Sequence, residues 1–121
     1  MNIFLCCFWQ LNNIHKTTFA VIVTYSNRFH LLRQAIDAAF REGADKIFVV
    51  DNCSHPDSRK QLKTYELSHP NRLIVIYLDE NLGSAGGFKQ GIEAAYDYVG
   101  DSSLKSMCDF IWLLDDDNVP Q

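Results

Sequence analysis

The chain has 121 residues, of which 47% are hydrophobic, and a formal net charge of −4. This length and composition suit one domain with a hydrophobic core. Its 11 basic residues are scattered along the sequence. Without a basic stripe to neutralise phosphates, binding to nucleic acid is not expected.

The four cysteines indicate neither a zinc site nor a disulfide framework, because two are adjacent and no Cys-x-x-Cys or Cys/His ligand spacing occurs. We therefore expect a reduced, cytoplasmic protein. The apolar start, residues 3–9, is too short to span a bilayer and lacks the pattern of a signal peptide. We interpret residues 1–18 as an N-terminal extension that docks on the domain or on a second copy of the chain.

The first predicted strand, residues 19–24, is a continuous apolar and β-branched run, which is typical of a buried strand. A polar turn, residues 25–28, follows it, and Ser26 or Asn27 can cap the next helix. Apolar residues at helical spacing predict that helix, and Gly43 ends it.

The second predicted strand, residues 46–50, delivers Asp51 and Asn52 at its carboxyl end. A helix is predicted to open at His55-Pro56-Asp57, since proline is favoured in the first helical turn. The third predicted strand, residues 73–78, again ends in polar residues. Asp51 can start a turn or accept hydrogen bonds from a ligand, and both readings stay open.

A glycine-rich turn, residues 82–87, is predicted to precede the third helix. Its glycines would let a bulky ligand approach the helix N-terminus, which favours anions, or would serve turn geometry and close helix packing. We expect one stripe of this helix to face inward. Its members are Phe88, Ile92, Ala95, Tyr96 and Val99.

The last predicted strand, residues 109–114, runs into three consecutive carboxylates, Asp115 to Asp117. Side by side these acids repel one another, and a divalent cation that bridges to phosphate oxygens would relieve the repulsion. The alternative is a solvated acidic turn.

Apolar strands alternating with helices predict an α/β fold over residues 19–121: a Rossmann-like, mostly parallel four-stranded sheet with helices on both faces. Because parallel strands end at one edge, the polar residues that follow them should gather there. These residues are Thr24, Asp51, Asp79 and Asp115 to Asp117. The glycine fingerprint of dinucleotide-binding proteins is absent after the first strand.

Four segments resemble the nucleotide-sugar-binding half of a family 2 glycosyltransferase of GT-A fold. They are residues 21–28, 49–54, 81–88 and 112–117, the last containing a match to the family's Asp-x-Asp motif. The sequence Asn-Leu-Gly-Ser-Ala-Gly-Gly-Phe at 81–88 is most similar to the rhamnosyl- and galactofuranosyltransferase-like branch. The resemblance covers residues 19–121 and implies transfer of a sugar, in cell-envelope polysaccharide synthesis, from a UDP- or dTDP-sugar donor to a glycan or lipid-linked acceptor.

The resemblance also implies roles for single residues. Thr24, Tyr25 and Asp51 would contact the nucleoside. Asp115 would reach the ribose side, and Asp117 together with Asp115 would hold a divalent cation, Mn²⁺ or Mg²⁺, on the diphosphate. That cation would stabilise the charge on the departing nucleoside diphosphate.

Five further residues would lie near the phosphates or the sugar: Arg28, Asn81, Gly83, Gly86 and Gly87. The family's catalytic base, an Asp or Glu, lies well downstream of the Asp-x-Asp motif, and this sequence ends shortly after Asp117. We therefore expect a fragment that is inactive alone because a base is needed to take the acceptor's proton. We also expect self-association through an uncovered face or edge of the sheet.

Two alternatives stay open. A receiver-like signalling module would have a similar length and an acidic metal pocket, although a receiver gathers its acids at earlier strands and closes with a fifth strand and helix that the sequence does not predict. A nucleotide-binding scaffold without catalysis would share the fold of the transferase.

Overall fold

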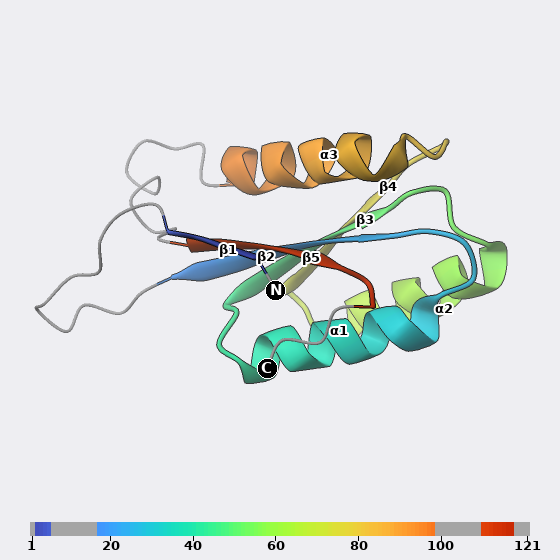
Figure 1. Cartoon of the computed structure of the whole chain (residues 1–121). Coiled ribbons are helices and arrows are strands. Elements are labelled where there is room, and N and C mark those ends of the chain that lie inside the picture. The colour runs from blue at the N-terminus through green and yellow to red at the C-terminus, as the bar shows by residue number, and fades with distance from the viewer. Residues whose placement is uncertain (1, 6–16, 99–109, 118–121) are drawn as a thin grey trace, which may run out of the picture.

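The computed structural model describes residues 2–5, 17–98 and 110–117. Within them, five strands form one sheet in the order β1-β5-β2-β3-β4, and three helices cover it (Figure 1). The elements are β1 (Asn2–Leu5), β2 (Thr18–Thr24), α1 (Phe29–Arg41), β3 (Lys46–Asp51), α2 (Pro56–Leu67), β4 (Leu73–Tyr77), α3 (Gly83–Tyr98) and β5 (Phe110–Asp115). None of these helices is long and apolar enough to cross a membrane.

The four strands predicted from the sequence are parallel to one another, which confirms the predicted α/β fold. In addition, β1 pairs antiparallel with β5, so residues that the sequence assigned only to an extension form a strand at the sheet edge. A run this short carries no period that distinguishes a strand from any other apolar segment, and its partner lies at the other end of the chain.

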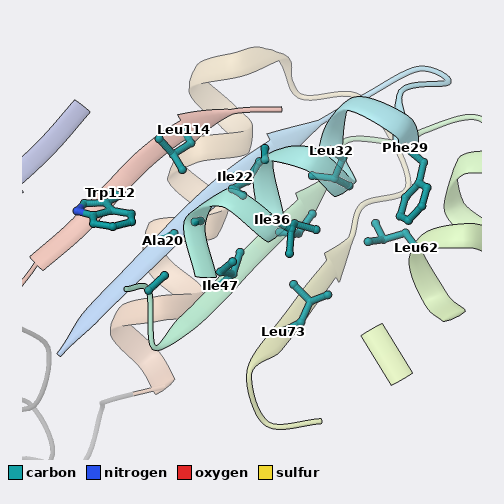
Figure 2. Packing of buried hydrophobic residues seen from close by; sticks show 14 residues of the cluster. Ala20, Ile22, Phe29, Leu32, Ile36, Ile47, Leu62, Leu73, Trp112 and Leu114 are labelled. Atoms are coloured by element: carbon teal, nitrogen blue, oxygen red, sulfur yellow. The ribbon is translucent and has the colours of Figure 1, made fainter. Parts of the chain in front are cut away.

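Helices cover both faces of the sheet, as predicted: α3 lies on one face, and α1 and α2 lie on the other (Figure 1). Alternate residues of β2 therefore enter two different cores. Ala20 and Ile22 pack toward α1 and α2, where Figure 2 shows them with Ile36. Phe19 and Val21 pack in the smaller core beneath α3. Burial on both faces explains why this strand is a continuous apolar run rather than an alternating one.

The start of α1 differs from the prediction. Neither Ser26 nor Asn27 caps the helix; Arg28 occupies the cap position without a side-chain cap hydrogen bond. Instead, Ser58 Oγ on α2 accepts a hydrogen bond from Phe29 N at 3.2 Å and donates to Asn27 Oδ1 at 2.7 Å. Because the capping group comes from a helix that follows later in the chain, local sequence could not identify it. The helix ends as predicted, with Gly43 at φ +110° just beyond it.

The glycine-rich stretch is the first turn of α3 rather than a turn that precedes it, since the helix begins at Gly83. The face of α3 that is buried against the sheet consists of Gly87, Gly91 and Ala95. A Cβ at Gly87 would lie 2.7 Å from Val23 Cγ1, so this glycine allows the close approach of α3 to the sheet. The packing interpretation of the glycines therefore holds at Gly87.

The predicted inward stripe of α3 is wrong at two positions. Ile92 is 37% exposed and Tyr96 is 57% exposed, because the helix turns its small residues toward the sheet. Phe88 is partly buried against the core beneath α3, as expected, and Val99 lies outside the described residues. A hydrophobicity pattern assigns large apolar side chains to the interior, whereas close helix–sheet packing here selects glycine and alanine.

At the other edge of the sheet, the Glu66 side chain of α2 protects β4. Its Oε2 accepts from Val75 N at 3.1 Å, and its Oε1 accepts from the Tyr77 hydroxyl at 3.1 Å. Side chains that occupy edge amides oppose pairing with another strand. The expected self-association stays a prediction, and this edge is a poor surface for it.

Candidate functional site

The strand register brings three distant segments to one end of the sheet. Thr24 at the end of β2 is aligned with Asp51 at the end of β3, and Val23 is aligned with Asp115 at the end of β5. Parallel strands that end together leave their following loops side by side. The predicted gathering of polar residues at the carboxyl ends of the strands is thus present in the structure for Thr24, Asp51 and Asp115.

A pocket of about 390 Å³ lies at this end of the sheet. Ten residues line it: Val23, Tyr25, Arg28, Asn52, Asn81, Gly83, Ser84, Asp115, Asp116 and Asp117. Six of them were proposed from the sequence: Tyr25, Arg28, Asn81, Gly83, Asp115 and Asp117. The other four sequence candidates, Thr24, Asp51, Gly86 and Gly87, do not line it.

Asp116 is the most strongly bound of the three consecutive acids. It is 2% exposed, and its Oδ2 accepts from Thr24 Oγ1 at 2.9 Å and from Arg28 Nε at 2.8 Å. Its Oδ1 accepts from Arg28 Nη2 at 2.9 Å, so the guanidinium and carboxylate form a two-point ion pair. This pairing raises the pKa of Arg28 above its ordinary value, mainly through the hydrogen bond to Asp116.

The sequence assigned no role of its own to Asp116, and it assigned Thr24 to the nucleoside. In the structure the Thr24 hydroxyl is buried and donates to Asp116 instead. One signal could have revealed this arrangement. Side chains alternate along a strand, so continuing the inward positions Trp112 and Leu114 by two residues predicts that Asp116 turns inward, as it does in the structure. A central acid that turns inward needs a basic partner, and Arg28 follows a neighbouring strand end.

Asp51 is also committed to contacts within the protein. Its carboxylate is fully buried, with Oδ2 accepting from Arg59 Nε and Oδ1 accepting from Ser54 N at 3.0 Å. Arg59 Nη2 also donates to Leu78 O at 2.8 Å. Asp51 and Arg59 therefore tie the ends of β3 and β4 together. The predicted contact of Asp51 with a nucleoside stays a prediction, since its carboxylate is not exposed in the pocket.

Asn52, which received no role from the sequence, positions the start of α3. Its Nδ2 donates to Gly83 O at 2.9 Å, and its Oδ1 accepts from Leu82 N at 2.8 Å. Asn81 Oδ1 accepts from Gly83 N at 2.7 Å and adds a local cap. The N-terminus of α3, where helical N–H groups lack intrahelical partners, is thereby held beside the pocket.

The chain matches the family model described as Glycosyl transferase family 2 over residues 20–121. The chain belongs to glycosyl transferase family 2. One solved structure similar to this chain is "Mannosyltransferase PcManGT from Pyrobaculum calidifontis in complex with GDP-Man and Mn2+", with 17% identity and a TM-score of 0.57. That match covers 68% of this chain and 25% of the mannosyltransferase. No curated protein matches the sequence.

A second similar structure is S. aureus TarS, with 20% identity and a TM-score of 0.55, covering 84% of this chain and 17% of TarS. The family 2 chain thus spans a quarter or less of the length of these two proteins. At these identities the likeness shows the fold, which is the GT-A fold that the sequence resemblance implied. Family membership favours the transferase interpretation over the receiver-like alternative.

The carboxylates that line the strand-end pocket fit a divalent cation whose other ligands would come from a bound diphosphate. Asp115 is exposed, and the side chain of Asp117 is 59% exposed. The carboxylate of Asp116 is already paired with the Arg28 guanidinium. Among the described residues, no cluster of three or more His, Cys, Asp or Glu side chains is arranged to hold a metal ion. Mg²⁺ sites commonly use one or two carboxylates together with substrate phosphates, so the donor set agrees with this mode of binding.

Tyr25 presents an aromatic ring at the rim of the same pocket. Tyr25 is 45% exposed, and the Arg28 guanidinium carbon lies 4.8 Å from the centroid of its ring. A cation over the ring face restrains the tyrosine through a cation–π contact. Arg28 thereby links the aromatic side of the pocket to its acidic side.

Proposed function

We propose that this chain is the donor-binding domain of a metal-dependent glycosyltransferase. It binds a nucleoside diphosphate sugar for transfer of the sugar to an acceptor hydroxyl. The observation that carries the proposal is one pocket at the carboxyl ends of parallel strands, lined by Tyr25, the start of α3, Asp115 and Asp117. In open α/β sheets, ligands generally bind in a crevice at the carboxyl ends of the strands.

Each part of the pocket suits a different part of such a donor. The exposed ring of Tyr25 can stack on a planar base. The N-terminal amides of α3, held by Asn52, favour an anionic group such as a phosphate. Asp115 and Asp117 would hold a divalent cation, Mn²⁺ or Mg²⁺, at the diphosphate. When bound, the cation supplies Lewis-acid stabilisation of charge on the leaving diphosphate.

Support for the donor class comes from family membership and from the mannosyltransferase, which is described in complex with GDP-Man and Mn²⁺. For this chain we propose a UDP- or dTDP-sugar donor and a glycan or lipid-linked acceptor. The rhamnosyl- and galactofuranosyltransferase-like specificity rests on the sequence at 81–88 and stays part of the proposal.

Transfer also requires a base that takes the proton of the acceptor hydroxyl. Of the acids that line the pocket, Asp116 is bound to Arg28, and we assign Asp115 and Asp117 to the cation. We therefore assign no catalytic base among the lining residues. Residues 1–121 are expected to bind the donor without transferring its sugar.

Calorimetric titration of UDP and dTDP, with and without Mn²⁺, tests the proposal. We expect binding that requires Mn²⁺ in the wild type and is at least tenfold weaker in Asp117→Asn, since a metal ligand is lost. Asp97→Asn makes the same chemical change at an exposed position of α3 outside the pocket and should bind as the wild type does. Nucleotide binding that ignores both Mn²⁺ and Asp117→Asn would contradict the assigned metal site.

A further inference from the structure

Arg28 lies between two of the three consecutive acids, and it contacts them unequally. It pairs with Asp116 through two hydrogen bonds of 2.8 and 2.9 Å. The same Nη2 atom lies 3.6 Å from Asp117 Oδ2, within ion-pair distance but too far for a hydrogen bond. Asp117 therefore lies next to a cation that is already held by another carboxylate.

The charges at the rim of the pocket follow from this arrangement. Three carboxylates and one guanidinium leave a net charge of about −2, which one divalent cation can balance. Asp116 is almost fully buried, whereas Asp117 is largely exposed. Without Asp116 as a partner, the closest carboxylate to the Arg28 guanidinium is that of Asp117. The guanidinium would then compete with a metal ion for the same oxygen atoms.

We propose that Asp116 is a positioning residue that sequesters Arg28 and so keeps Asp117, together with Asp115, available to a divalent cation. The inference rests on the proposed function, because it assumes that the rim binds a cation. It assigns the central acid of the Asp-Asp-Asp sequence a role in metal binding without making it a ligand. Thr24, which donates to the same carboxylate, helps to fix Asp116 in place.

The Asp116→Asn variant separates charge from shape. The asparagine has nearly the same size, and its Oδ1 can still accept from Thr24 Oγ1, so the fold is expected to persist. The neutral amide no longer balances Arg28, and the rim charge falls to about −1. We expect Mn²⁺ affinity to fall about fivefold, the range of a partly exposed ion pair.

The double variant Asp116→Asn/Arg28→Gln gives the decisive comparison. It removes both charges of the pair formed by Arg28 and Asp116, restores the rim charge to about −2, and leaves neither charge without its partner. We expect its Mn²⁺ affinity to be at least twofold higher than that of Asp116→Asn, although Arg28→Gln also removes the contact with Tyr25. A purely structural role for the pair predicts the opposite, because the double variant has lost more contacts than the single one.

The measurement is Mn²⁺ binding in the presence of UDP, followed by the loss of the free-ion electron paramagnetic resonance signal. Circular dichroism confirms folding of each variant, and Arg33→Gln, an exposed arginine of α1 outside the pocket, serves as control. Weak binding by Asp116→Asn with recovery in the double variant supports the inference. Normal binding by Asp116→Asn, or equally weak binding by both variants, overturns it while the proposed function stands. A wild type that binds no Mn²⁺ overturns both.

Discussion

Replacing Asn52 with alanine should release the start of α3 from the sheet. Asn52 is 2% exposed, and its side chain makes two hydrogen bonds to the segment that begins α3, one to Gly83 O and one from Leu82 N. A net contribution of about 0.5–1.5 kcal/mol for each bond gives a combined loss of about 1–3 kcal/mol. The loss should fall on the adjoining backbone at the start of α3.

Hydrogen exchange of single amides measures this effect directly. A loss of about 2 kcal/mol in local opening speeds exchange about 30-fold at Leu82, whose N–H donates to Asn52, and at Gly83, whose N–H donates to Asn81, since 1.4 kcal/mol corresponds to a factor of ten. Amides in the centre of β3, such as Val49, should change less, because they exchange by a larger unfolding event. Donor affinity should fall with the loosened helix start. Unchanged exchange at Leu82 and Gly83 would refute the positioning role of Asn52.

Three further predictions concern the scaffold around the pocket. Gly91→Ala should lower the free energy of unfolding by about 1–2 kcal/mol in urea, because its Cβ would lie 2.3 Å from Val21 Cγ1, and overpacking exceeds the gain in helix propensity; unchanged stability would contradict the close approach of α3. Arg59→Gln should cost about 3 kcal/mol by the same assay, since buried Asp51 loses its charged partner; a cost below about 1 kcal/mol would show that this pair is not needed. Burial raises the pKa of Tyr65 from 10.0 to about 12, so the folded state disfavours the tyrosinate. The contribution of Tyr65 to the free energy of unfolding should be intact below pH 10 and be lost between about pH 10 and 12. Ultraviolet titration of Tyr65 at its ordinary pKa would contradict this.

The parallel sheet was predictable because burial on both faces leaves a direct trace in the sequence. Each of the strands β2, β3, β4 and β5 is an apolar run with polar residues at its carboxyl end, and alternation with helices fixes their common direction. The position of the pocket follows from that direction. The strand order could therefore place Asp115 and Asp117 at the pocket, whereas the roles of Tyr25 and Arg28 there came from the family resemblance.

The contacts inside the site were not predictable in the same way. Asp116 and its partner Arg28 are 88 positions apart, and Asn52 and Gly83 are 31 positions apart. Periodicity says which face a residue occupies, but it does not say which distant group that residue meets. The misassigned face of α3 has a different cause: glycines carry no hydrophobic signal, although they are the residues that allow the helix to pack closely.

The central claim is that the strand-end pocket binds a nucleoside diphosphate through a divalent cation. Paramagnetic broadening of backbone amide signals by Mn²⁺, recorded with UDP present, tests it most directly because it reports the location of the ion. The account predicts broadening centred on Asp115 and Asp117 and extending to Ser84 and Tyr25, and weakest at the opposite end of the sheet, where β3 and β4 begin at Lys46 and Leu73. Broadening centred elsewhere, or independent of UDP and absent from Asp117, would contradict the account.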